Sequence, residues 1–388
     1  MSNQPPVIGP DGVARPYIGG QALIEGVMMR SPHSVSAVVR RRDGSLVVRE
    51  REMPDLRRGA RAWPLIRGVV SLVEALKLGS AALRFSAEIF ERDMEAQAQE
   101  KEAQEKRAEA DRPPGGPSVL SALSLPIVAL LTNEPEPLPA APSGDKSDGA
   151  RKLFTLLSIG FALLLFVALP QAFAAGTSKL FGLDLNVREP LFQLLTGAAK
   201  LTIVIGYMLA IRRMPEIYRV FQYHGAEHKS IYTYESGAEL SVANARGNTT
   251  LHPRCGTTFL VMVALVSIFV FTAIGPFLPN LGLGAVADNL LFFLMKLPFL
   301  PVIAAITFEI QRVLARHCTT GPLRALLWPG FLVQKITTIE PDDAQLEVAL
   351  AALRMTLRRE QASGAAAPVE DETFEGYASL RDRTQAPA

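Results

Sequence analysis

Long apolar runs are the feature that most constrains the fold of this chain. Leu153–Ala175 and Thr257–Leu278 contain no charged residue. Each is long enough to cross a bilayer as a helix, which takes about 20 apolar residues. Leu191–Ile211 and Leu290–Ile310 are of similar length and contain only one and two charged residues, respectively. We therefore predict four transmembrane helices.

Basic residues near the ends of these runs predict the orientation. Arg151 and Lys152 precede the first run, and Arg212 and Arg213 follow the second, whereas residues 279–289 contain no Lys or Arg. Because cytoplasmic flanks carry the excess of basic residues, both termini are expected in the cytosol. The first fifty residues lack the apolar core of a signal peptide. Membrane topology accounts for the basic residues, so we expect a lipid bilayer and no nucleic acid as partner.

The remaining segments differ in pattern. SVSAVVRRRDGSLVVRERE alternates apolar and polar residues around Asp43-Gly44, which predicts a β-hairpin. The expected fold class is an α-helical multi-pass membrane protein with a small N-terminal β element. The predicted order is a β-rich segment (residues 1–55), an amphipathic helix (56–87), an acidic and Pro-rich insert (88–150), the membrane domain (151–335), a cytosolic helix (336–360) and a disordered tail (361–388).

The loop 212–256, between the second and third runs, contains the sequence QYHGAEHK. On a helix, His224, Glu227 and His228 project from one face. Two imidazoles one turn apart could hold a metal ion, and the glutamate could act on a water that the ion activates. The order H-x-x-E-H is that of inverted zincins. The alternative is a membrane-surface helix on which these are ordinary polar residues.

Further donors lie near the ends of the apolar runs. LHPRCGT places His252 and Cys255 at the start of the third run, where they are either metal ligands or part of a turn before a helix. His317 and Cys318, after the fourth run, are expected to be structural. Glu309 is either a functional residue within a span or the partner of a neighbouring arginine.

Five segments together resemble the YqhQ-like family of bacterial multi-pass membrane proteins, described as predicted metal-dependent enzymes. They are YIGGQALIEGVMMRSP, RGVVSLVEALKLG, FQYHGAEHKSIYTYE, LHPRCGTTFL and QKITTIEPDDAQLEVALAAL. The resemblance implies the bacterial inner membrane and a metal-associated role for His224, Glu227, His228, His252 and Cys255. It leaves open whether Gln21 or Glu25 reaches the same site. The long insert, about residues 88–149, departs from the family pattern.

Two functions of different class follow. The first is a membrane-embedded hydrolase, of which a peptidase acting on a membrane protein or peptide is one form. Zn²⁺ or another divalent ion would be held by His224, His228 and, as third ligand, His252, with Glu227 as general base. The second is a membrane scaffold or assembly factor, in which Cys255 completes a closed structural site. A transporter finds little support, because the runs lack paired interruptions.

Overall fold

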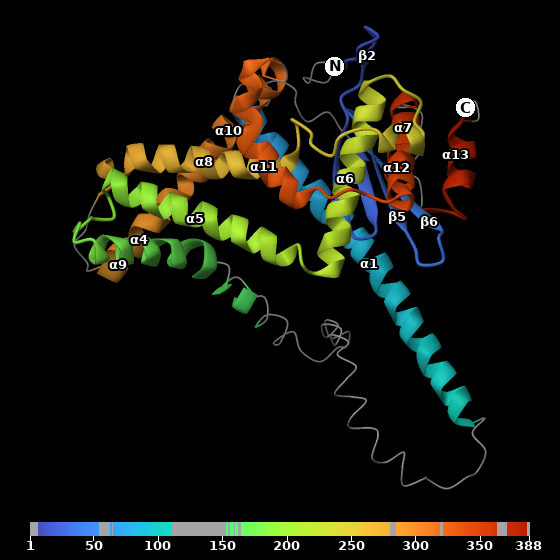
Figure 1. Ribbon diagram of the computed structural model, residues 1–388, viewed down its shortest axis with the longest axis horizontal. Coiled ribbons are helices and arrows are strands. Elements are labelled where there is room, and N and C mark those ends of the chain that lie inside the picture. Colours follow the sequence, from blue (N-terminus) through green and yellow to red (C-terminus); the bar gives the residue numbers. More distant parts are fainter. Residues whose placement is uncertain are drawn as a thin grey trace. The chain divides into compact units, whose positions relative to one another are not determined.

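A computed structural model shows a mainly helical chain with a small antiparallel sheet near the N-terminus (Figure 1). The structure describes residues 7–53, 63, 65–110, 153, 156–158, 160–161, 164–279, 285–318, 321–362 and 371–385. Contacts divide the chain into two units, Met1–Glu91 with Leu165–Ala388, and Arg92–Leu164. The sheet, the apolar helices and the candidate site all belong to the first unit.

The elements of this chain have the following bounds. The strands are β1 (Val7–Ile8), β2 (Ala14–Arg15), β3 (Gly19–Leu23), β4 (Gly26–Arg30), β5 (Ser34–Arg40), β6 (Leu46–Glu52) and β7 (Glu372–Phe374). The helices are α1 (Ile66–Ala110), η2 (Leu164–Ala168), α4 (Leu169–Leu180), α5 (Pro190–Ile211), α6 (Pro215–Glu235), α7 (Val242–Arg246), α8 (Gly256–Ile274), η3 (Gly275–Phe277), α9 (Ala285–Lys296), η4 (Leu297–Phe299), α10 (Leu300–His317), η5 (Pro322–Leu327), α11 (Trp328–Thr337), α12 (Asp343–Gln361) and α13 (Tyr377–Gln385).

The five-stranded sheet, in the order β3-β4-β5-β6-β7, is covered by helices on both faces. The predicted hairpin is confirmed, since β5 pairs antiparallel with β6 around Gly44, which has a positive φ of 88°. Side chains alternate between the faces of a strand. Val27 and Met29 therefore pack with α6 and α12, whereas Met28 packs with α1. Burial on both faces fixes the register of the sheet.

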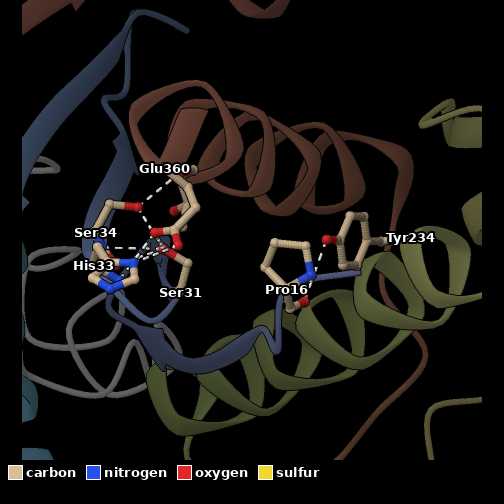
Figure 2. Close-up of polar contacts among 7 residues, drawn as sticks. Pro16, Ser31, His33, Ser34, Tyr234 and Glu360 are labelled. Carbon is tan, nitrogen blue, oxygen red and sulfur yellow. Dashed lines mark hydrogen bonds and ion pairs between the residues drawn. The ribbon is translucent and has the colours of Figure 1, made fainter. Parts of the chain in front are cut away.

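A partly buried carboxylate ties the end of α12 to the β4–β5 turn (Figure 2). Glu360 accepts hydrogen bonds from Ser31 Oγ at 2.6 Å and from the His33 backbone N–H at 3.0 Å. His33 Nδ1 lies 2.9 Å from the other carboxylate oxygen. Figure 2 also shows the Tyr234 hydroxyl of α6 donating to the Pro16 carbonyl. These contacts fix α6 and α12 to the N-terminal strands.

Three helical segments of the described chain are long and apolar enough to cross a membrane: Pro190–Ile211, Gly256–Phe277 and Leu290–Leu314. They correspond to the second, third and fourth predicted spans. The first predicted span, Leu153–Ala175, lies partly outside the described residues, and its residues 164–175 belong to the shorter apolar helix Leu164–Leu180. The structure thus supports three of the four expected spans. α8 packs against α5, α10 and α11. Figure 1 shows α8 beside α5.

Helix α1 covers one face of the sheet and also contacts a candidate span. Arg67 forms a bidentate ion pair with Glu309 of α10, which identifies the partner of this carboxylate within a candidate span. Beside it, a Cβ on Gly68 would lie 3.1 Å from the Ala305 Cα, so the two helices approach closely. α1 runs beyond the predicted end at residue 87 into the insert, because Glu, Ala, Gln and Lys are good helix formers. Residues 111–150 of the insert lie outside the described residues.

The C-terminal tail, predicted to be disordered over 361–388, contains β7 and α13. β7 extends the sheet by pairing antiparallel with β6. Leu380 of α13 is fully buried in the core that includes α12. A short polar segment is therefore ordered by tertiary burial, which its local composition does not reveal.

Candidate metal centre

Helix α6 carries the central residues of the site. Pro215 occupies its first turn, where a missing N–H costs no helical hydrogen bond, and Gly237 follows its end with a positive φ of 75°. The helix is buried almost continuously from Tyr223 to Ile231. This continuity is unusual for a segment containing His224, Glu227 and His228, and it shows that these side chains face protein.

Three potential ligand atoms converge at this point of α6. His224, His228 and Cys255 each offer one donor, and the three atoms lie within 4.8 Å of one another. His224 Nε2 is 3.1 Å from Cys255 Sγ. All three side chains are buried. Two imidazoles and a thiolate suit zinc and other borderline transition metals better than magnesium or calcium. The group could therefore hold a metal ion.

Hydrogen bonds of the two histidines orient their rings for this purpose. His224 Nδ1 lies 2.8 Å from the Thr337 carbonyl oxygen, and His228 Nδ1 forms a short contact with that of Thr250. In both rings the Nδ1 proton is donated to a carbonyl oxygen, so both Nε2 atoms face the cluster, and a metal ion would take the place of any proton on them. Within the part of the chain that the structure describes, His228 Nε2 is buried without a hydrogen-bond partner. Metal-bound histidines characteristically donate their other ring N–H to a carbonyl or carboxylate. The residues thus fit a metal ion.

Electrostatics in the cluster favour the thiolate form of Cys255. Burial would raise the pKa of this thiol, but the nearby His224 and His228 outweigh burial and bring the pKa well below its ordinary value. Burial would also lower the pKa of His224, but the Cys255 charge and hydrogen bond raise it to about 9. The thiolate is the form of cysteine that binds a metal.

Glu227 lies beside the cluster without belonging to it. Burial raises the pKa of its carboxyl, an effect that His224 and His228 partly offset. The nearby backbone N–H of Gly20 in β3 is a further, smaller cause that lowers the pKa of this carboxyl. A Cβ on Gly20 would lie 2.8 Å from Glu227 Oε1, so this strand approaches the carboxylate as closely as only glycine permits. The side chain is therefore held in place from the opposite element.

His252, the predicted third ligand, lies beside the compact group and is not one of its three donors. Its ring centroid is 5.5 Å from that of His228, and its Nε2 lies 3.7 Å from a carboxylate oxygen of Glu235. Nδ1 accepts from the Arg254 N–H at 3.3 Å. Burial is the main cause that lowers the pKa of His252 to about 4, so the ring is neutral at pH 7. Cys255, predicted as a fourth ligand, is the residue that supplies the third donor of the compact group.

The other candidates lie apart from the cluster. His317 is exposed, with Nδ1 near the Val313 carbonyl, and Cys318 is buried at the end of α10. Glu25 forms a bidentate ion pair with Arg219, one turn before the site on α6. Gln21 contacts Gly79 of α1. Of the GGQALIEG signature, Gly20 is thus the residue that touches Glu227.

Gln334 is a residue of the site that motif reasoning missed. It is completely buried on α11 and accepts the His252 N–H at 2.7 Å. Its amide donates to the His252 carbonyl at 2.8 Å and to Thr258 Oγ1 at 2.6 Å. Gln334 thereby fixes the 252–255 turn that delivers Cys255. The only sequence signal was its position in a segment that resembles the family.

These features define a protein with three candidate membrane-spanning helices and a buried His-His-Cys group. The group lies at the end of one of these helices, because Cys255 directly precedes Gly256 of α8. Residues 63–359 match the family model "Protein of unknown function (DUF1385)". The chain is 30% identical over 354 residues to "Uncharacterized protein YqhQ" of Bacillus subtilis (strain 168), covering 90% of this chain and 94% of that protein. The chain therefore belongs to the YqhQ-like family, as its motifs predicted. No solved structure matches.

Proposed function

We propose that this protein is a membrane-embedded, metal-dependent hydrolase with its site at the cytosolic membrane face. The observation that carries the proposal is the group of His224, His228 and Cys255, three donors within 4.8 Å of one another, with the Glu227 carboxylate beside them. Three protein ligands leave one tetrahedral position open, which is the arrangement of catalytic zinc sites. Zinc is the metal that we expect, and a peptide or membrane protein the substrate.

The residues have distinct roles in this proposal. When bound, the ion would supply Lewis-acid activation of a water molecule and of the scissile carbonyl. Glu227, with a pKa raised by burial, would accept the proton of the attacking water and pass it to the leaving group. Gly20 would keep the carboxylate in reach through the close approach of β3. Gln334 would keep Cys255 in position through the turn that begins at His252.

A structural metal site in a membrane scaffold is the second candidate. The burial of all three donors favours it, because structural sites are closed to solvent and substrate. Such a site requires a fourth ligand and has no use for a general base. The two candidates therefore differ in the fourth coordination position and in the need for Glu227.

Cobalt substitution of the detergent-purified full-length protein tests both points. We expect a sulfur-to-cobalt absorption band that Cys255→Ser removes and that Glu227→Gln retains. Acetohydroxamate should change the visible cobalt bands of the wild type, because an open position accepts it. Absence of cobalt binding would overturn the metal site. Visible cobalt bands that acetohydroxamate does not change would support the structural metal site of a membrane scaffold instead.

Hydrolysis is then measured on a fluorogenic peptide library with protein in proteoliposomes. Glu227→Gln should lower the rate by about 10²–10⁴-fold, the usual contribution of a general base, while the cobalt spectrum is unchanged. Glu216→Gln, in the first turn of the same helix and exposed, is the matched control and should be active. Equal rates for wild type and Glu227→Gln would refute the role of Glu227 as base.

A further inference from the structure

A short segment after the last candidate span exposes large apolar side chains on one side. It consists of η5 and α11, residues 322–337. Four of its apolar residues are each 52–54% exposed: Leu323, Leu326, Trp328 and Leu332. Leu327 and Val333, by contrast, are only 3% exposed. One side of the segment therefore packs against protein, and the other remains open within the described chain.

The buried side of α11 is fixed against the candidate spans. A Cβ on Gly330 would overlap the Thr258 side chain of α8, so the two helices approach as closely as only glycine permits. Gln334, one turn further along α11, donates to Thr258 Oγ1 at 2.6 Å. Arg212 donates to the Lys335 carbonyl at 2.9 Å. Because of these contacts, α11 cannot turn its exposed side inward.

The same contacts define the depth of the segment. Arg212 directly follows the candidate span Pro190–Ile211. Thr258 lies in the first turn of the span Gly256–Phe277. The span Leu290–Leu314 ends shortly before η5 begins. Ends of all three candidate spans thus lie at η5 and α11, which places this segment at the boundary of the apolar layer.

The exposed side has the composition of a membrane interface. Trp328, Leu332 and Lys335 follow one another at helical spacing and share a face of α11. Lys335 Nζ lies 6.0 Å from the Trp328 ring centroid, and Arg324 Cζ lies 5.8 Å from that of Phe331. Tryptophan and basic side chains gather at the headgroup level, where the ring contacts acyl chains and the charge reaches water. A protein partner would have to remove both charges from water, so the bilayer is the partner that this surface fits.

We propose that η5 and α11 lie in the interface of the bilayer, with their exposed apolar side turned toward the acyl chains. Interfacial helices bury this side about 5–10 Å into the boundary between headgroups and acyl chains. The segment would thus bind lipid without spanning the membrane. The proposal rests on the three candidate spans and is independent of whether the metal centre is catalytic.

This location has a consequence for the metal centre, because α11 also holds its ligands. The Thr337 carbonyl lies 2.8 Å from His224 Nδ1. Gln334 fixes the turn that runs from His252 to Cys255. A helix seated on lipid would therefore hold the His-His-Cys group at the level of the bilayer surface.

Tryptophan fluorescence of the full-length protein in phosphatidylcholine vesicles tests the location. The chain has two tryptophans, Trp63 and Trp328, so Trp63→Phe leaves Trp328 as the single reporter. The quenchers are phosphatidylcholine brominated next to the headgroup, phosphatidylcholine brominated near the ends of the acyl chains, and aqueous iodide. Trp328 should lose most emission with the shallow bromines, less with the deep bromines and little with iodide.

Two control variants, made in the background Trp63→Phe and Trp328→Phe, calibrate the depth. Phe269→Trp, at an exposed position within the candidate span of α8, should be quenched most by the deep bromines. Tyr377→Trp, in α13 beside α12, should be quenched by iodide and by neither lipid.

Three results for Trp328 would overturn the proposal. Quenching by iodide alone would place the segment in water, and quenching mainly by the deep bromines would place it inside the apolar layer. Protection from all three quenchers would mean that protein, such as a second copy of this chain, covers the surface.

Discussion

Substitution of Gly20 by alanine tests the close contact between β3 and Glu227. The added Cβ would lie 2.8 Å from both Glu227 Cγ and Oε1 and 2.9 Å from Cδ. Carbon atoms in contact are about 3.5–4.0 Å apart, so the side chain must shift by roughly 0.7 Å or more. Glu227 is only 5% exposed and cannot swing into solvent. Overpacking of this kind costs about 1–3 kcal/mol of unfolding free energy.

Gly19→Ala provides the matched comparison, because its Cβ would meet only the Tyr17 ring at 3.6 Å and Arg30 at 3.8 Å. We expect Gly20→Ala to lower the thermal unfolding midpoint in detergent and Gly19→Ala to leave it nearly unchanged. Cobalt uptake should survive in both variants, since neither touches the three donors. Hydrolysis should fall only in Gly20→Ala, because Glu227 is displaced there. Equal midpoints for the two variants would refute the close approach of the strand.

Three further substitutions test other contacts. Gln334→Met leaves the His252 N–H and carbonyl unpaired, and metal affinity measured with a competing chelator should fall about 10–100-fold, as for other residues that orient ligands. Glu360→Ala removes the acceptor of Ser31 and His33 and should cost about 1–3 kcal/mol by thermal unfolding, whereas the exposed Glu102→Ala should cost under about 0.5 kcal/mol. Glu309→Gln weakens the ion pair with Arg67, so amide hydrogen exchange in the first turns of α1 should accelerate about tenfold while that of α12 is unchanged.

Local patterns predicted the parts of this fold that depend on local physics. The length of the apolar runs is enough to mark the three candidate spans, because about 20 consecutive apolar residues are what a helix needs to cross a bilayer. Helical periodicity correctly placed His224 and His228 on one side of α6, since residues four apart share a face. The Asp43-Gly44 turn likewise marked the hairpin.

Long-range contacts decided what the sequence left open. His252 and Cys255 are three residues apart, and either could have faced the α6 histidines. The choice depends on the turn between them, which Gln334 fixes from 82 residues away. The order in the C-terminal tail has the same origin, because Leu380 is buried by elements distant in the sequence. Neither contact has a periodicity that a single sequence displays.

The position of Glu227 bears on the choice between catalyst and scaffold. A buried carboxylate costs free energy unless it is paired or hydrogen-bonded, and burial raises the pKa of this one. Glu227 contributes no atom to the compact group of donors among the described residues. A purely structural site would be as stable with an apolar side chain there, and β3 would then need no glycine at position 20. Retaining a carboxylate beside an incomplete set of ligands is physically reasonable where a proton acceptor is required, which favours the hydrolase.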